Sequence, residues 1–378
     1  MAKVGLIFEA VIRDIASDGR GIAPHESGAV VFVPGVWTGE TCRIKIVGKK
    51  GRAFIGQLVE VIMPSLARCE PPCAHHGFTK HECGGCPWMF VDYQQQLVAK
   101  QKRVTDYFER LGAEDKVQPI WAAEPLGYRN RAQFKTDGVE LGFVAEGTNQ
   151  IAAIQDCLIL SPANRKTLEQ LIRKLPNPNW VPAKREKWLT LDIDENTDFE
   201  NVSVNKRLPF QQGNSRQNIR MREWLTEKAD TSGCNTILEL FCGSGNFTEV
   251  IANADRHILA VEGDQQAIQT LSEKKLPNVK SLVANLFDEK VFEKIYNLRN
   301  DFDTLILDPP RDGLKSKNKL LRKKNKMENI FYISCDLATL VRDIQFFQDN
   351  KYKIIEVQPL DQFPHTPHIE TLVHLRLK

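Results

Sequence analysis

The sequence contains no apolar run that approaches the length of a membrane-spanning helix, and its first residues lack the apolar core of a secretory signal. We therefore expect a cytoplasmic protein with no membrane partner. The net charge of +3 is too small to indicate a nucleic-acid partner by itself. The number of cysteines, nine, is odd, which argues against a disulfide framework in a reducing compartment. Clustered cysteines in such a protein indicate a metal site or catalysis.

The length of 378 residues exceeds one ordinary domain, and the pattern changes along the chain without an internal repeat. Residues 1–63 contain short β-rich runs between Gly and Pro, which predict a small β-barrel. This barrel is either structural or an OB-like RNA-binding module. Residues 64–210 begin with a Cys-, Pro-, Gly- and His-rich loop segment, continue with an amphipathic helix over 92–112, and become strand-rich and irregular after 128.

In residues 211–378 strands and helices alternate, which is typical of a doubly wound α/β sheet. A helix is predicted over 215–229. The last two strands are separated by a short loop and predict an antiparallel hairpin at one edge of the sheet. The predicted strands of this seven-stranded sheet are residues 236–240, 257–261, 280–284, 304–307, 329–333, 353–357 and 371–377.

A glycine-rich turn, Glu239-Leu-Phe-Cys-Gly-Ser-Gly-Asn246, follows the first of these strands and opens a helix. Such a turn lets a ligand approach the backbone at a helix N-terminus. The dinucleotide fingerprint requires a third glycine where Thr248 stands, which disfavours a nicotinamide cofactor. Three later strands end in polar residues, at Glu262, Asn285 and Asp308, and ligands bind at the carboxyl ends of strands in open α/β sheets. This order predicts an adenosylmethionine site.

These motifs resemble those of class I methyltransferases. With the motifs below, the chain is similar over nearly its whole length to the RNA uracil-5-methyltransferase family, in the 23S rRNA branch that has a TRAM domain and an iron–sulfur cluster. The resemblance implies a Rossmann-like methyltransferase domain, an N-terminal OB-like TRAM barrel and a central iron–sulfur domain. Gly213 replaces the family's usual Val. The cofactor-binding positions that the resemblance implies are Gln212, Phe241, Gly243, Asn246, Glu262, Asn285 and Asp308.

Methylation at carbon 5 of uracil requires a thiolate that adds to carbon 6 and a base that removes the carbon 5 proton. Cys335 ends a predicted buried strand, and Glu370 follows the final hairpin turn, so both lie at the edge that holds Asp308. Taken alone, Cys335 could be a buried structural cysteine and Glu370 a surface carboxylate. The resemblance assigns the nucleophile to Cys335, in Ser334-Cys-Asp-Leu-Ala-Thr-Leu-Val-Arg-Asp343, and the base to Glu370, in Phe363-Pro-His-Thr-Pro-His-Ile-Glu370. We interpret Cys242, in the glycine-rich turn, as a packing residue.

The cysteine-rich segment reads C-x3-C-x9-C-x2-C from Cys69 to Cys86, a spacing that suggests a four-thiolate zinc site. The family resemblance implies a 4Fe–4S cluster instead, with zinc as the alternative. The ligands that it implies are Cys73, Cys83, Cys86 and the distant Cys157. The nine-residue spacer exceeds the usual five, and Cys69 is an extra candidate ligand.

Two basic segments are candidates for RNA contact. Gly127-Tyr-Arg-Asn-Arg-Ala-Gln-Phe-Lys135 combines aromatic residues with Arg129, Arg131 and Lys135, which suits base stacking and phosphate contact, although an ordinary strand with outward charges has the same pattern. The run 315–326 contains many Lys and Arg and no acidic residue, which fits a solvated loop or phosphate contact.

Three functions fit the motifs. The first is uracil-5 methylation of a flipped-out uridine in RNA, by a monomer that acts on ribosomal RNA or, with the same chemistry, on transfer RNA. The second is amino-methylation of adenine or cytosine through Asp308-Pro-Pro, disfavoured because Arg311 stands where those enzymes have an aromatic residue. The third is a non-catalytic RNA-binding protein, against which the intact Cys335, Glu370 and Asp308 argue.

Overall fold

The computed structural model describes residues 2–206, 210–322 and 327–378. The chain divides into two compact units. Unit 1 comprises residues 1–98, 124–208 and 363–367, and unit 2 comprises residues 99–123, 209–362 and 368–378. Within the described ranges, no helix combines the length and apolar character needed to cross a membrane.

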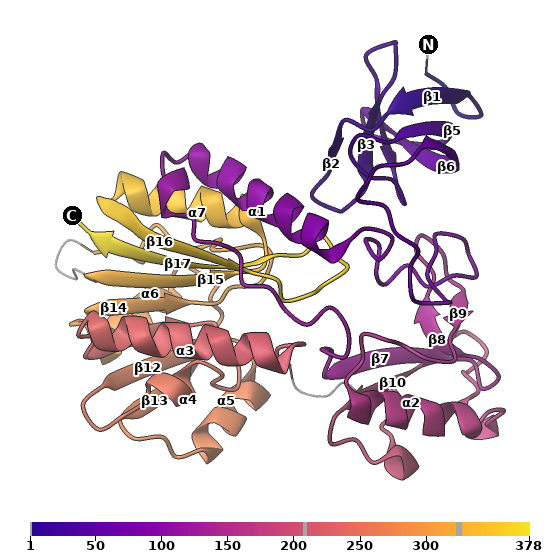
Figure 1. Ribbon diagram of the computed structural model, residues 1–378. Helices are drawn as coiled ribbons and strands as arrows, with labels where there is room; N and C mark the ends of the chain where they lie inside the picture. Colours follow the sequence, from indigo (N-terminus) through magenta and orange to yellow (C-terminus); the bar gives the residue numbers. More distant parts are fainter. Residues whose placement is uncertain (1, 207–209, 323–326) are drawn as a thin grey trace. The chain divides into compact units, whose positions relative to one another are not determined.

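Unit 2 is built on a seven-stranded sheet with the order β13-β12-β11-β14-β15-β17-β16 (Figure 1). The first five strands in this order pair in parallel, whereas β17 is antiparallel to both of its neighbours. The strands are β11 (Thr236–Leu240), β12 (His257–Glu262), β13 (Val279–Val283), β14 (Thr304–Leu307), β15 (Asn329–Ser334), β16 (Tyr352–Leu360) and β17 (Glu370–Leu377).

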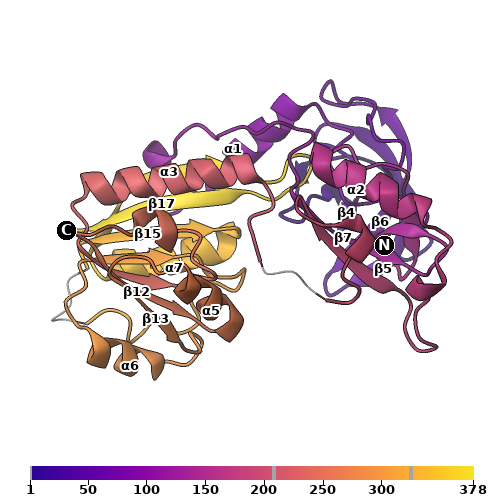
Figure 2. The same cartoon turned by 90° about the horizontal axis from the view of Figure 1, so that it is seen from below.

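Helices cover both faces of this sheet, because its central strands are apolar on both sides. Along β11, Leu238 and Leu240 belong to one core, while Ile237 belongs to the other. The first core is closed by α1 (Tyr93–Glu109), α6 (Val291–Leu298) and α7 (Leu337–Asp349). The second is closed by α3 (Ser215–Thr231), α4 (Thr248–Ile251) and α5 (Gln265–Glu273); Figure 2 shows α3 running along the sheet.

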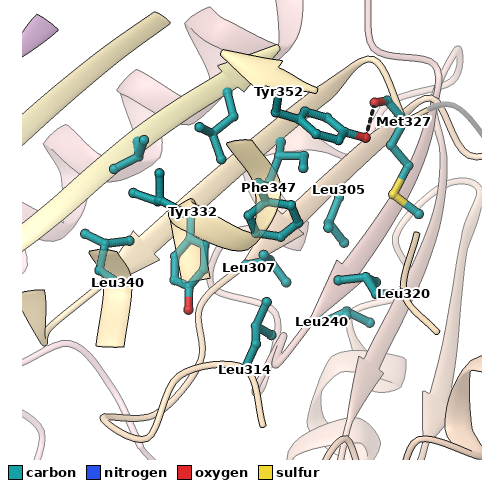
Figure 3. Packing of buried hydrophobic residues seen from close by; sticks show 14 of the residues in the cluster. Leu240, Leu305, Leu307, Leu314, Leu320, Met327, Tyr332, Leu340, Phe347 and Tyr352 are labelled. Atoms are coloured by element: carbon teal, nitrogen blue, oxygen red, sulfur yellow. Dashed lines mark hydrogen bonds between the residues drawn. The ribbon is translucent and has the colours of Figure 1, made fainter. Parts of the chain in front are cut away.

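Figure 3 shows the first core at close range. Leu307 from β14, Tyr332 from β15 and Phe347 from α7 are among its buried side chains. The Tyr352 hydroxyl donates a 2.7 Å hydrogen bond to the Met327 carbonyl oxygen, so this phenol is buried without leaving its polar atom unpaired. This packing fixes the ends of β14 and β15, which carry candidate site residues.

A buried ion pair ties α1 to the end of β16. The Lys100 ammonium lies 2.6 Å from Asp361 Oδ1, and both side chains are fully buried. Burial lowers the pKa of Lys100, whereas the charge of Asp361 raises it. Breaking one partner of such a pair leaves an uncompensated buried charge, which is costly. The pair therefore anchors the strand end from which the turn toward Glu370 departs.

Unit 1 contains two sheets with separate apolar cores. The N-terminal sheet has six strands in the order β1-β5-β6-β4-β3-β2, namely β1 (Ile7–Val11), β2 (Asp14–Ile15), β3 (Gly21–Pro24), β4 (Val30–Val33), β5 (Thr41–Lys50) and β6 (Ala53–Met63). The second has the order β10-β7-β8-β9, namely β7 (Arg131–Thr136), β8 (Leu141–Val144), β9 (Ile151–Ala153) and β10 (Leu189–Asp194), and packs against α2 (Pro162–Arg173). Short 3-10 helices span Pro178–Trp180 and Phe199–Asn201 in unit 1, and Glu114–Lys116 in unit 2.

The structure confirms the predicted doubly wound sheet and the closing antiparallel hairpin, with each predicted strand matched within a few residues. The predicted helix over 92–112 ends earlier, at Glu109. Helix α2 was not predicted, although Ser161 caps it and Pro162 starts it, a standard signal of a helix N-terminus.

Candidate active site

The carboxyl ends of the parallel strands form one edge of the sheet in unit 2. Phe241 directly follows β11, Asp308 follows β14 and Cys335 follows β15. Because these strands are parallel neighbours, their ends meet at the same edge, where open α/β sheets bind ligands. Phe241, Asp308 and Cys335 therefore lie at the same edge of the sheet.

The glycine-rich turn after β11 has a backbone that only a few residue types tolerate. Phe241, Gly243 and Gly245 have φ angles of +63°, +55° and +87°, in the left-handed region. A Cβ at Gly245 would collide with Leu271, whereas a Cβ at Gly243 would meet nothing within 4 Å. The turn is thus packed on the Gly245 side and open at Gly243, where a ligand has access to the backbone.

Glu262, at the end of β12, is fixed beside this turn by backbone donors. Its Oε2 accepts a hydrogen bond from the Gly243 N–H at 3.2 Å, and its Oε1 accepts one from the Asp264 N–H at 3.0 Å. Asp264 in turn caps α5 by accepting from the Gln266 N–H. A carboxylate held at this position is suited to accept hydrogen bonds from ribose hydroxyls.

The other predicted cofactor residues make local contacts that orient them. The Phe241 and Phe287 rings lie with centroids 6.1 Å apart, and Asn285 accepts a hydrogen bond from the Phe287 N–H. Asn246 exchanges two 2.9 Å amide hydrogen bonds with Asn218 of α3. Gln212 Oε1 accepts a hydrogen bond from the Gln362 side chain at 3.2 Å.

Cys335 directly follows β15, and Glu370 begins the neighbouring strand β17. Ser334 pairs with Thr371 in the antiparallel register, so the next pair outward is Cys335 with Glu370. Cys335 is half-buried, and Glu370 is only 5% exposed. The strand pairing alone therefore brings the predicted nucleophile and the predicted base together, although they are far apart in sequence.

The titratable groups at this edge are close enough to shift one another's pKa values. Burial, followed by the charges of Glu370 and Asp308, raises the pKa of the Cys335 thiol to about 12, while Arg311 lowers it. Burial and Asp308 also raise the pKa of Glu370 well above its usual value, again opposed by Arg311. Burial and Glu262 raise the pKa of Asp308 to about 7. A carboxyl with a raised pKa is a stronger base once ionised, as proton abstraction requires.

Two further titratable residues, Glu239 and His368, also belong to this edge. Glu239 is buried, accepts a 2.7 Å hydrogen bond from the Thr248 hydroxyl, and has a pKa raised by burial to about 8. The pKa of His368 is lowered to about 4 by burial and by nearby Arg311, Lys100 and Arg103. Neutral His368 therefore adds no charge to the edge at neutral pH.

The predicted cysteine ligands line one pocket in unit 1. Cys73, Cys83, Cys86 and Cys157 share its wall with His75 and His76, and Cys69 is exposed and absent from this lining. Burial raises the pKa of Cys157 to about 11, and burial and the neighbouring thiols raise that of Cys86 further. Across the described ranges, no group of three or more His, Cys, Asp or Glu side chains is arranged to hold a single metal ion.

The residues predicted to contact RNA have partners within unit 1. Arg131 forms a two-point ion pair with buried Asp192, and the Lys135 ammonium donates a 2.7 Å hydrogen bond to Thr190. Arg129 donates to the Arg131 carbonyl oxygen, and its charge lowers the pKa of the nearby Cys157. RNA contact by these three residues stays a prediction.

The basic run 315–326 is described up to Arg322, and residues 323–326 lie outside the described residues. Lys315, Lys317 and Lys319 form ion pairs with Asp312, Asp343 and Glu293, respectively. Arg322 lies over the Tyr296 ring. Three ion pairs and one cation–π contact therefore hold the described part of the run against other residues of unit 2.

The doubly wound sheet, the open glycine-rich turn and the Glu262 carboxylate at the end of β12 define a class I adenosylmethionine-dependent methyltransferase. Residues 190–378 match the family described as tRNA (Uracil-5-)-methyltransferase. An uncharacterized RNA methyltransferase of Nitrosomonas europaea is 41% identical over 96% of this chain and 95% of its own length. The chain belongs to the RNA (uracil-5-)-methyltransferase family.

Two further comparisons describe its relatives. The 23S rRNA (uracil(1939)-C(5))-methyltransferase RlmD of Vibrio campbellii is 28% identical over 94% of this chain and 92% of its own length. The crystal structure of the Pyrococcus abyssi tRNA (uracil-54, C5)-methyltransferase with S-adenosyl-L-homocysteine aligns with a TM-score of 0.68 and 19% identity, over 97% of this chain and all of that one. At this identity the structural match shows the shared fold.

Proposed function

We propose that this chain transfers a methyl group from adenosylmethionine to carbon 5 of a uridine in 23S ribosomal RNA, with Cys335 as nucleophile and Glu370 as base. The observation that carries this proposal is the pairing of β15 with β17, which sets Cys335 opposite Glu370 beside Asp308. Adenosylmethionine supplies the electrophilic methyl group. The open backbone at Gly243 and the fixed Glu262 carboxylate support its binding at this edge.

The chain's own residues perform the remaining steps. The Cys335 thiolate adds to carbon 6 of uracil, forming an S–C6 bond and moving the C5=C6 electron pair into an enolate. Carbon 5 of this enolate is nucleophilic and takes the methyl group, so the S–CH3 bond of the donor breaks and the thioether S-adenosylhomocysteine leaves. Glu370 then accepts the carbon 5 proton, the double bond re-forms, and Cys335 leaves as a thiolate. The raised pKa of Glu370 suits this proton transfer.

We infer three functional parts: residues 1–63 as a TRAM-like RNA-binding barrel, 64–210 as the central domain and 211–378 as the methyltransferase domain. The hairpin of β5 and β6 supports RNA contact by the barrel. Its exposed cations Lys45, Lys49, Lys50 and Arg52 form no ion pair within the described residues. Such a cluster suits phosphate contact. We further propose a cytoplasmic monomer.

Ribosomal RNA is preferred over transfer RNA because curated relatives that cover this chain almost end to end are named as 23S rRNA enzymes. Purified protein with labelled adenosylmethionine is expected to methylate ribosomal RNA from a strain that lacks the gene, and to leave the same strain's transfer RNA unlabelled. Digestion should yield 5-methyluridine. Label in transfer RNA alone would assign the same chemistry to that substrate, and label on an amino group of adenine or cytosine would refute the uracil reaction.

We also propose that Cys73, Cys83, Cys86 and Cys157 hold a 4Fe–4S cluster, with zinc as the alternative. The donor set fits, because four thiolates are the usual ligands of such a cluster and these thiols share one pocket wall. The reaction needs no redox step, so the cluster would fix this part of unit 1.

Protein purified without oxygen should be brown and contain iron and sulfide. The Cys157→Ala variant should lose most of the iron, because its thiol lines the pocket. The matched Cys69→Ala variant, which removes an exposed thiol outside the pocket, should keep it. Colourless wild-type protein that contains zinc, or full iron content in Cys157→Ala, would contradict the cluster as assigned.

A further inference from the structure

Asp343 of α7 is a fully buried carboxylate that accepts hydrogen bonds from two residues of the loop after Asp308 and from Tyr332 of β15. Its Oδ2 accepts from the Leu314 N–H at 2.7 Å and from the Tyr332 hydroxyl at 2.8 Å. Its Oδ1 accepts from the Lys317 ammonium, also at 2.7 Å. A buried carboxylate with this many donors is expensive to disturb, so it holds its partners in one arrangement.

Two more side chains of α7 hold the same loop. The Thr339 hydroxyl donates to the Arg311 carbonyl oxygen at 3.0 Å, and the Arg342 guanidinium donates to the Asp312 carbonyl oxygen at 3.0 Å. Thr339, Arg342 and Asp343 are three and four residues apart and therefore share one helix face. We call these three residues the α7 clamp.

The loop packs against the α7 clamp without spare room. Gly313 has a φ angle of +65°, and a Cβ at this position would lie 2.5 Å from Asp343 Oδ2. Glycine is thus required both by the backbone conformation and by the closeness of the carboxylate. The loop can shift little while the clamp is intact.

The clamp connects two parts of the candidate active site. Helix α7 starts two residues after Cys335, at Leu337, and Asp336 caps it by accepting from the Thr339 N–H at 2.9 Å. The clamped loop starts directly after Asp308 and carries Arg311. The Arg311 side chain is exposed and makes no hydrogen bond or ion pair with the described residues, although its charge acts on Cys335 and Glu370.

We propose that Asp343 is a positioning residue that, with Thr339, holds Arg311 where its charge favours the Cys335 thiolate for addition to uracil. The inference rests on the proposed function of Cys335. Asp308 and Cys335 end neighbouring parallel strands, and the Thr339 hydroxyl lies 3.0 Å from the Arg311 carbonyl oxygen and 3.1 Å from Asp336 Oδ1, so the loop at Arg311 is held at the start of α7 beside Cys335. Among the described residues, the charges of Glu370, Asp308 and Arg311 act on Cys335. Glu370 and Asp308 are acidic and oppose formation of the Cys335 thiolate. Arg311 is the one cation among these three residues, and how strongly it favours the thiolate depends on where its charge lies.

Alkylation of Cys335 in the free enzyme tests this inference without RNA. The rate of carboxamidomethylation by iodoacetamide, followed by mass spectrometry of the Cys335 peptide from pH 6 to 10, reports the thiolate fraction. Arg311→Gln should lower the rate at neutral pH about tenfold, a shift of about one pKa unit. Asp343→Asn and Thr339→Val should shift the profile in the same direction by less.

The double variants separate positioning from a structural role. If the clamp acts through Arg311, adding Asp343→Asn or Thr339→Val to Arg311→Gln causes no further shift. Lys319→Gln, which removes a loop cation paired with Glu293, should leave the profile unchanged. If Asp343→Asn does not fold, Thr339→Val carries the test alone, because it keeps the side-chain volume.

Two results would overturn the inference: an unchanged profile in Arg311→Gln, or equal clamp effects with and without Arg311. Methylation by the wild-type enzyme is a separate measurement. If the alkylation shifts occur but no RNA uridine is methylated, the clamp stands and the proposed function fails.

Discussion

The Cys335→Ala variant is expected to lose methylation of uridine by at least about a thousandfold, while it still binds adenosylmethionine. Without the thiolate, carbon 5 of uracil stays a poor nucleophile and cannot attack the methyl group. The cofactor residues lie on other strands: Phe241 follows β11 and Glu262 ends β12. Single-turnover methylation and calorimetric titration of adenosylmethionine measure the two quantities separately.

Cys69→Ala is the matched control for Cys335→Ala, because it also removes a thiol but one that is exposed in unit 1. It should retain wild-type methylation. Activity of Cys335→Ala within about tenfold of wild type would show that the reaction needs no thiol at this position. That result would favour an amino-methyltransferase, which uses no nucleophilic thiol.

The Glu370→Gln variant should stall after methyl transfer. Glutamine keeps the size of the side chain but cannot accept the carbon 5 proton, so Cys335 cannot be eliminated. We expect a covalent protein–RNA complex to accumulate on ordinary RNA, with release of tritium from 5-tritiated uridine slowed by at least about a thousandfold. A denaturing gel and counting of released tritium follow both effects.

The same substitution should make the free thiol more reactive. Glu370 is among the groups that raise the pKa of Cys335, so its removal lowers that pKa and increases the thiolate fraction at a given pH. Iodoacetamide should therefore alkylate Cys335 faster in Glu370→Gln than in wild type above neutral pH. Glu273→Gln, at an exposed position of α5, should change neither adduct formation nor alkylation. Normal turnover by Glu370→Gln would assign the base elsewhere.

The central strands of unit 2 were predictable because β11, β12, β14 and β15 are short, largely apolar runs ended by a polar residue or a turn. Alternation of strands and helices then implied parallel pairing, and parallel pairing implied that Asp308 and Cys335 end at one edge. The structure adds the register, which sets Cys335 opposite Glu370. Register depends on pairing between distant segments, which a local pattern does not contain.

Several contacts lay beyond sequence reasoning for the same reason. The buried pair of Lys100 and Asp361 joins residues far apart in the chain, and nothing near Lys100 distinguishes it from a surface lysine. Helix α2 had a signal in Ser161 followed by Pro162, but the segment around it is irregular. The clamp residues were visible as part of the Cys335 motif, yet their partners after Asp308 became clear only from the packing of α7.

The most direct test of the account is to trap the reaction on RNA that contains 5-fluorouridine. The fluorine replaces the hydrogen at carbon 5, so the base has no proton to remove and Cys335 cannot be eliminated. With adenosylmethionine present, we predict a stable adduct that, after proteolysis and mass spectrometry, maps to the Cys335 peptide and carries both the nucleotide and one methyl group. An adduct on another cysteine, such as Cys242, or methylation of uridine with no trapped adduct, would contradict the account.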